Sequence, residues 1–301
     1  MAERTELQSE GGALDSVLNE LQREHAVKEI SGLETGFAML SRALDGLRPG
    51  LHLLIGRPAI GKTSLSRQLL DQVAMHNQVP GVFFSFAESA KELRIKTLAR
   101  LSNLDSREIH RGPAFLLNWY GVPKAQDGGA DQFPPSWDKL KSAAEEAKSW
   151  LDQIYLIECR PQTTLQQIEA QITAVRSLAN TDDMVIVVDD CQRLGDRDQS
   201  LSIRFPIVVE QLQQAAANLH APLLAIWPDL GEYDETELQV WSERVASADV
   251  ILVMEHDRER TKKLIEPNQA ITLHIVKNRR GEKGKLAFNF CPAFAKFTEA
   301  T

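Results

Sequence analysis

Between an apolar run and a helix-forming segment, the chain reads Gly56-Arg57-Pro58-Ala59-Ile60-Gly61-Lys62-Thr63, followed by Ser64. The run 51–55 predicts a buried strand, and a helix is expected from residue 61 to about 75. Glycines at these positions let backbone N–H groups converge on phosphate oxygens, and the start of a helix adds its positive dipole end. The order strand, glycine-rich loop, helix therefore predicts the phosphate cradle of a P-loop NTPase, with residues 56–64 holding ATP.

The cradle supplies two of the groups that phosphoryl transfer needs. Lys62 is expected to reach the β- and γ-phosphates, and the Thr63 hydroxyl to bind Mg²⁺. A second acidic group must hold the magnesium, and the apolar strand 184–188 ends in Asp189-Asp190. Asp189 is therefore the expected Walker B carboxylate. The alternative is that both acids only end a strand.

The rest of the chain alternates between strand-like and helix-like segments. Helices are expected over 137–151 and 206–219 and after two capping boxes, Ser89-x-x-Glu92 and Thr164-x-x-Gln167. Strands are expected at 82–86, 154–157, 223–227 and 250–254, and 271–276 with 285–290 predict a C-terminal hairpin. This alternation predicts an α/β fold with a mostly parallel, doubly wound sheet to which the antiparallel hairpin is added.

Composition narrows the class of protein. The chain has 301 residues, 43% of them hydrophobic, and a net charge of −8. A net negative charge argues against binding to DNA or to a membrane through the overall charge of the chain. It does not exclude a local basic channel, because binding depends on where the charges lie. No apolar run approaches the roughly 20 residues that span a bilayer. Three widely spaced cysteines, Cys159, Cys191 and Cys291, fit a reduced cytoplasm and suggest no metal site.

The main domain is expected to span residues 30–301, with one separate segment before it and one surface insertion within it. Residues 1–29 are predicted to be a disordered segment with a short helix at 13–26, where Leu14, Val17, Leu18 and Leu21 form one apolar stripe. That helix packs either on its own domain or on a neighbouring subunit. Residues 112–136 are rich in Gly and Pro and predict a surface insertion.

Several motifs in order resemble one family, the C-terminal motor domain of DnaB-type replicative helicases, which has a RecA-like fold. The resemblance covers about residues 30–297, and no counterpart of the family's separate N-terminal domain is expected in this chain. The motifs are Thr35-Gly36-Phe37-x-x-Leu40, Gly46-Leu47-x-Pro49-Gly50, the loop 57–63, Phe84-Ser85, Leu98-Ala99-Arg100-Leu101-Ser102, Val188-Asp189-Asp190-Cys191-Gln192 and Lys277-Asn278-Arg279-Arg280-Gly281.

The resemblance implies a homo-oligomeric ring, usually of six subunits, with ATP between neighbours and single-stranded DNA in the channel. It also implies 5′-to-3′ helicase activity in DNA replication. Arg279 is then the arginine finger that reaches the γ-phosphate of the adjacent subunit, with Lys277 beside it. A guanidinium stabilises the charge that spreads over phosphate oxygens in the transition state. The alternative is a solvated basic hairpin.

Two positions depart from the family's pattern. The family's water-activating glutamate falls at Ala87, so Glu88, one residue later, is the expected general base; alternatively it only favours the dipole of the following helix. The family's polar sensor falls at Pro228, which cannot donate a hydrogen bond. The following segment 231–237 carries four acids, which would repel DNA phosphates.

Three functions compete on this basis. The first is an ATP-hydrolysing motor on single-stranded DNA. The second is a RecA-like ATP-binding regulator in which the nucleotide controls oligomerisation or partner binding. A small-molecule kinase is a distant third, because no acceptor-binding lid is evident beyond the insertion.

Overall fold

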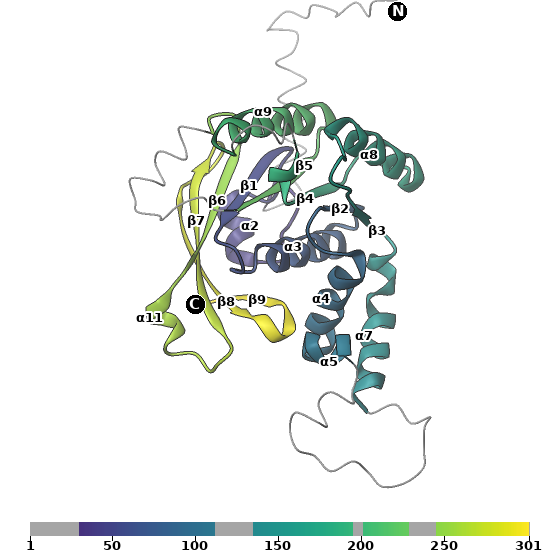
Figure 1. Ribbon diagram of the computed structural model, residues 1–301, viewed down its shortest axis with the longest axis vertical. Coiled ribbons are helices and arrows are strands. Elements are labelled where there is room, and N and C mark those ends of the chain that lie inside the picture. Colours follow the sequence, from purple (N-terminus) through teal and green to yellow (C-terminus); the bar gives the residue numbers. More distant parts are fainter. Residues whose placement is uncertain (1–29, 112–134, 195–200, 229–244, 301) are drawn as a thin grey trace, which may run out of the picture.

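A computed structural model describes residues 30–111, 135–194, 201–228 and 245–300. In this part of the chain nine strands form one sheet in the order β3-β2-β4-β5-β1-β6-β7-β8-β9 (Figure 1). The strands are β1 (Gly50–Gly56), β2 (Gly81–Ser85), β3 (Ile154–Glu158), β4 (Val185–Asp189), β5 (Pro222–Pro228), β6 (Val250–His256), β7 (Gln269–Asn278), β8 (Gly284–Cys291) and β9 (Lys296–Glu299).

The first six strands are all parallel, as the alternating sequence pattern predicts. Crossovers that run in opposite directions along such a sheet place their helices on opposite faces. One apolar core accordingly joins the sheet to α2 (Ala38–Leu44), α3 (Lys62–Asn77) and α4 (Ala90–Ser102). A second core joins the other face to α8 (Leu165–Ala179) and α9 (Leu201–Leu219), so the fold is doubly wound (Figure 1).

The last strands turn antiparallel, and the predicted hairpin is confirmed as β7 and β8. A third strand, β9, extends it and was not predicted, because four residues are too few for a periodic pattern. The extension folds back against α3 (Figure 1). There the buried Gln68 side chain donates to the carbonyl of Phe297 at 2.9 Å and accepts from its N–H at 2.7 Å. Hydrogen bonds thus connect the C-terminal strands to α3, the helix that follows the glycine-rich loop.

Most predicted elements are present, with shifted ends. Both capping boxes are confirmed, at the starts of α4 and α8. Helix α7 begins at Pro135, and α9 begins at Leu201 and contains Pro206, where the prediction had begun a helix. Pro206 is the sixth residue of α9, so it lacks the N–H that would bond the carbonyl four residues earlier, and the helix continues with that one backbone hydrogen bond missing. The short α2, α5 (Ser106–Arg111) and α11 (Arg258–Thr261) were not predicted.

Some predictions fall outside the described residues: the helix at 13–26, nearly all of the insertion 112–136, and the acidic segment 231–237. None of the described helices is both long and apolar enough to cross a membrane.

A buried ionic cluster fixes α4 against α3. The Asp71 carboxylate pairs with Arg67 Nη1 at 2.6 Å and with Arg100 Nη2, and it accepts a hydrogen bond from Thr97 Oγ1 at 2.7 Å. The three charged side chains are at most 7% exposed. One carboxylate therefore compensates two buried guanidinium groups, and it connects the helix that follows the loop to the helix that follows β2.

We expect Asp71→Asn to destabilise the fold by about 3–5 kcal/mol, because it leaves two buried cations without an anion. Denaturant-induced unfolding measures the effect. The control is Glu259→Gln, which removes an exposed pair with Lys262 at 2.7 Å and should change stability by less than about 1 kcal/mol. Equal effects of the two substitutions would contradict a stabilising role of the cluster.

Candidate nucleotide-binding site

The predicted phosphate loop connects the end of β1 at Gly56 to the start of α3 at Lys62. Its backbone is left-handed at Ala59, with φ 64°, and at Gly61, with φ 99°. Gly61 is the N-cap of α3 and provides no side-chain hydrogen bond to the first turn. The first amides of the helix therefore have no side-chain cap, which is the arrangement that binds an anion.

The Lys62 ammonium lies over its own loop. Nζ donates to the carbonyl oxygens of Gly56 at 2.5 Å and Arg57 at 2.9 Å. The predicted phosphate-binding lysine is thus already directed at the region that the loop encloses. Ser64, in the first turn of α3, is buried at 6% exposure.

The position of Gly61 admits no side chain. A Cβ atom there would lie 2.9 Å from the rings of both Phe290 and Phe297, which come from β8 and β9. These rings stack on each other with centroids 4.3 Å apart. Phe297 is in turn bonded to Gln68 of α3. The rings of β8 and β9 therefore pack directly against the loop, and this contact leaves room only for glycine at position 61.

Asp189 is the last residue of β4, as predicted, and its side chain is 3% exposed. Oδ1 accepts a hydrogen bond from the N–H of Asp190 at 3.0 Å, and Oδ2 is buried without a hydrogen-bond partner in the described structure. Burial raises the pKa of Asp189 to about 6; the Thr63 hydroxyl lowers this pKa, and the charge of Glu88 raises it further. Thr63, Asp189 and Glu88 therefore lie near one another.

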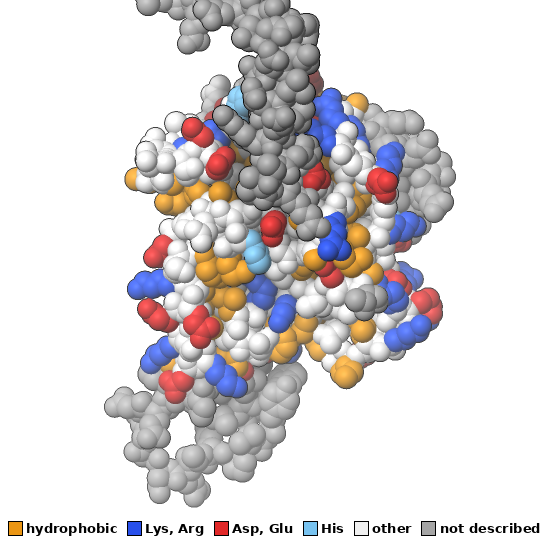
Figure 2. All heavy atoms as spheres, turned by 180° about the vertical axis from the view of Figure 1, so that it is seen from behind, with side chains coloured by type: hydrophobic (Ala, Val, Ile, Leu, Met, Phe, Trp, Pro, Cys, Tyr) orange, Lys and Arg blue, Asp and Glu red, His pale blue; other side chains and the backbone are white. Residues whose placement is uncertain are grey.

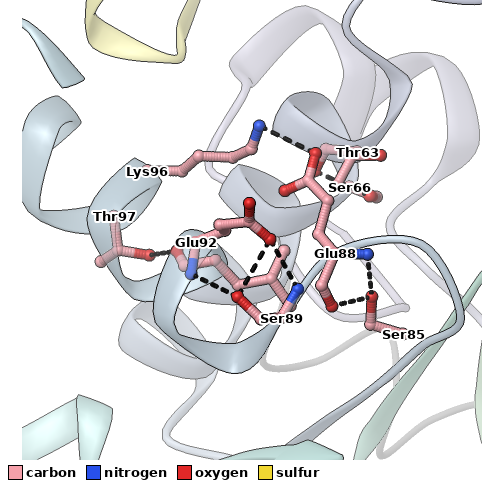
Figure 3. Close-up of polar contacts among 9 residues, drawn as sticks. Thr63, Ser66, Ser85, Glu88, Ser89, Glu92, Lys96 and Thr97 are labelled. Carbon is pink, nitrogen blue, oxygen red and sulfur yellow. Dashed lines mark hydrogen bonds and ion pairs between the residues drawn. The ribbon is translucent and has the colours of Figure 1, made fainter. Parts of the chain in front are cut away.

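Glu88 extends from the turn after β2 toward Thr63 (Figure 3). The Ser85 hydroxyl holds this turn: it accepts from the Glu88 N–H at 3.0 Å and donates to the Glu88 carbonyl at 2.7 Å. Ser85 is the direct neighbour of Asp189 in the sheet. Glu92, not Glu88, satisfies the amide at the start of α4. The geometry therefore favours the interpretation of Glu88 as a group of the site over the helix-dipole alternative.

The Glu88 carboxylate has a cationic partner that the sequence analysis did not identify. Lys96 of α4 lies 3.0 Å from Oε1 (Figure 3). The other oxygen, Oε2, is buried and makes no hydrogen bond within the described residues. The i, i+4 spacing of Glu92 and Lys96 could have placed Lys96 on this face of the helix.

The residues present fit a magnesium ion with a phosphate ligand. Hard cations prefer oxygen ligands, and magnesium is usually held by one or two carboxylates together with substrate phosphates. Buried polar atoms are nearly always hydrogen-bonded, so Oδ2 of Asp189 is an exception that requires an explanation. A cation held by Asp189 and the nearby Thr63 hydroxyl would provide one.

Beside the loop lies a cleft of about 740 Å³. Its lining combines Arg57 and Ile60 of the loop with residues 254–259, Thr261, Gln269 and Thr272. Desolvation lowers the pKa of His256 in this cleft, and the charges of Arg258 and Arg57 lower it further. The volume is that of a small-molecule site. The lining carries two arginines, Arg57 and Arg258, and three acids, Glu255, Asp257 and Glu259, so its charge does not favour an anionic ligand.

Arg279 and Lys277 lie at the opposite edge of the sheet. Strand β7 runs antiparallel to β6, which places its last residue, Asn278, beside Val250 at the start of β6. Arg279 Nη1 contacts Asp249 Oδ1 at 3.0 Å, and its side chain is 64% exposed. Lys277 Nζ donates to the Ala246 carbonyl at 2.6 Å. The structure thus brings together Lys62, Thr63, Asp189 and Glu88, whereas the predicted finger residues lie apart from them.

Pro228 ends β5 directly beside Gly56 of the loop. The expected sensor position is therefore next to the loop, and its side chain has no hydrogen-bonding atom. The indole nitrogen of the adjacent Trp227 is buried and makes no hydrogen bond among the described residues.

The fold and the loop together define a P-loop NTPase domain of the RecA-like type. The family model described as DnaB-like helicase C terminal domain matches residues 32–228. The chain therefore belongs to the DnaB-like helicase family, as a C-terminal-type domain. This confirms the resemblance inferred from the sequence motifs.

Relatives and solved structures agree with this family. The Replicative DNA helicase DnaB of Geobacillus stearothermophilus is 23% identical over 281 residues, which are 89% of this chain and 57% of the relative. The protein of that name from Pasteurella multocida is 33% identical over 84 residues, 28% of this chain and 18% of the relative. This chain thus covers less than two-thirds of the length of either.

Two solved structures share the fold. One, an ATPase domain, matches with a TM-score of 0.78 and 16% identity, over 97% of this chain and all of that one. A DnaB-like replicative helicase, determined with its interactions with primase, matches with a TM-score of 0.74 and 16% identity, over 97% of this chain and 69% of that one.

We expect Asp189→Asn to stabilise the magnesium-free protein by about 2–3 kcal/mol at pH 7, because the folded state then no longer buries an unpaired charge. The folded protein binds the Asp189 proton more tightly than the unfolded chain, whose ordinary pKa is 3.8. The destabilisation by the charged form therefore disappears as the pH falls from about 6 to about 4. Denaturant unfolding at both ends of this range measures it; a loss of stability in the variant at pH 7 would contradict the expectation.

Proposed function

We propose that this chain binds Mg-ATP at the loop 56–64 and hydrolyses it as the motor domain of a ring that moves on single-stranded DNA. The observation that carries the proposal is the division of the site between two edges of the sheet. The loop, Asp189 and Glu88 lie at one edge, and the exposed Arg279 lies at the other. In this proposal each subunit carries a nucleotide site that lacks an arginine, and at its other edge it carries the arginine that completes the site of a neighbouring subunit.

Arg279 lies too far along the sheet to reach the phosphate loop of its own subunit. Asp249, which contacts Arg279, is hydrogen-bonded to Leu51 near the start of β1. Gly56, where the loop begins, is five residues further along this strand, or roughly 17 Å at about 3.3 Å per residue. This is more than an arginine side chain spans. A head-to-tail contact that joins one edge to the other would complete each site, and repetition of such a contact closes a ring.

Each residue of the proposed site has a role in hydrolysis. The loop amides and Lys62 bind the β- and γ-phosphates and orient the γ-phosphoryl group. Glu88 accepts the proton of the attacking water, for which it must come within hydrogen-bond reach of that water. The neighbour's Arg279 stabilises the charge on the phosphoryl oxygens in the transition state. Thr63 and Asp189 would hold magnesium, which would supply positive charge to the bound phosphates.

The link to single-stranded DNA rests on family membership and on the relatives, which are replicative DNA helicases. The face seen in Figure 2 carries basic and acidic side chains interspersed over its described surface. This face is therefore not the proposed DNA path, which we place in the channel of the ring.

Pro228 favours a second function, an ATP-binding regulator. A motor must transmit the state of the γ-phosphate to its DNA-binding loops, and a proline beside Gly56 cannot do so by donating a hydrogen bond. In a regulator, ATP would control the association of subunits without movement along DNA.

We expect Arg279→Ala to lower the rate of ATP hydrolysis by roughly 10³-fold or more, as for other arginine fingers, while ATP affinity changes little. The reason is that the guanidinium acts on charge that develops only in the transition state. Steady-state turnover and equilibrium binding of a fluorescent ATP analogue measure the two quantities. The control is Arg280→Ala, an exposed arginine one residue further along. Equal losses of binding and turnover in the Arg279 variant would contradict a role in the neighbour's site.

A second experiment separates motor from regulator. For a motor we expect single-stranded DNA to raise ATP turnover several-fold, with an effect that weakens steeply as salt is added. Turnover is measured with and without a single-stranded oligonucleotide, and size-exclusion chromatography is run with and without ATP. An unchanged turnover together with an ATP-dependent size would support the regulator instead.

A further inference from the structure

Asp249 connects the end of β7 to the start of β1. Its Oδ1 accepts a hydrogen bond from Arg279 Nη1 at 3.0 Å, and its Oδ2 accepts one from the N–H of Leu51 at 3.0 Å. Its backbone takes part as well: the carbonyl accepts from the N–H of Arg279 at 3.0 Å, and the N–H donates to the carbonyl of Leu51 at 3.0 Å. One residue therefore fixes both the main chain and the side chain of Arg279.

The sequence around Asp249 is shaped to admit its carboxylate. Gly50 has φ +138°, and a Cβ atom there would lie 2.5 Å from Oδ2 of Asp249. Only glycine leaves room for the carboxylate to reach the N–H of Leu51. The Asp249 side chain is 19% exposed, whereas that of Arg279 is 64% exposed. A rigid, mostly buried anion thus holds one end of an exposed cation.

Asp249 also offsets a repulsion between cations. Desolvation lowers the pKa of Lys277, the charge of Arg279 lowers it further, and the charge of Asp249 raises it. Lys277 is held by the Ala246 carbonyl, three residues before Asp249. Without the carboxylate, the Lys277 ammonium would push the Arg279 guanidinium away from its present direction.

We propose that Asp249 is a positioning residue that presents Arg279 to the site of the neighbouring subunit. This inference rests on the proposed function, in which Arg279 acts on phosphates bound by that neighbour. A guanidinium has five N–H donors, and Asp249 takes one of them from the side chain. The Arg279 side chain is 64% exposed, so the ion pair can persist while the other donors of the guanidinium bind phosphate. A guanidinium that is already oriented when the phosphate binds lowers the activation barrier to hydrolysis, although Asp249 itself makes no contact with the phosphate.

The test is Asp249→Asn, in which an amide oxygen can still accept the Leu51 N–H while the charge that holds the guanidinium is lost. We expect kcat to fall between about 10- and 100-fold, as for a misplaced catalytic group, while the KM for ATP stays within about twofold of the wild-type value. The control is Asp45→Asn, because Asp45 likewise pairs with an arginine, Arg48, and accepts a backbone N–H, that of Ser31. The control should leave kcat unchanged.

Mixed oligomers distinguish positioning from a general structural defect. Asp249→Asn subunits keep an intact phosphate loop, and Lys62→Ala subunits keep an intact arginine. In a 1:1 mixture with random assembly, about one contact in four joins these two intact halves in a heterologous interface. We therefore expect the mixture to reach about a quarter of wild-type turnover, well above the mean of the two parents. A structural defect in the Asp249 variant would give no such gain.

The same mixture made with Arg279→Ala separates this inference from the proposed function. If Arg279→Ala gains activity on mixing but Asp249→Asn alone keeps wild-type kcat, or gains nothing on mixing, the positioning role is wrong and the finger stands. If Arg279→Ala also gains nothing on mixing, the arginine does not act on a neighbouring subunit, and both the finger and the positioning role are wrong.

Discussion

The loop between β1 and α3 holds its shape only if position 61 carries no side chain. Gly61 has a left-handed backbone and lies against the stacked rings of Phe290 and Phe297. These rings reach the loop because β8 and β9 fold back onto α3, where Gln68 bonds Phe297. Residues more than two hundred positions apart thus define one short loop. The helix that follows this loop has no side-chain cap, and an anion can bind at such an uncapped helix start.

The direction and pairing of the strands determine where the other residues of the proposed site lie. Parallel strands that end at the same edge bring Asp189 and the turn of Glu88 toward Thr63, and the buried cluster around Asp71 fixes α4 relative to α3. Antiparallel pairing has the opposite consequence for Arg279, because β7 runs back to the start of β6. The division of the proposed catalytic groups between two edges of the sheet, and with it the need for a second subunit in the proposed mechanism, therefore follows from strand direction.

Short sequence motifs predicted those features of the fold and site that depend on residues close together in the chain. The glycine-rich loop, the parallel strands, both capping boxes and Asp189 follow from short motifs, and the family follows from their order. The contacts around those motifs depend on tertiary packing. Nothing near Gly61 in the sequence points to Phe297, and nothing near Arg279 points to Asp249. Likewise, the sequence left the orientation of Glu88 open, because it depends on a turn that the Ser85 hydroxyl closes. Short elements such as β9 lack the length that a periodic signal needs.

Equilibrium titration of the purified protein with ATP and magnesium, compared with Lys62→Ala, tests the central claim most directly. The Lys62 ammonium contacts the loop carbonyls at both Gly56 and Arg57. The account predicts saturable binding by the wild-type protein and a loss of at least about tenfold in affinity without the ammonium group, since hydrogen bonds to charged groups contribute about 1.5–3 kcal/mol. Equal affinities of the two proteins, or no binding of ATP by either, would contradict it.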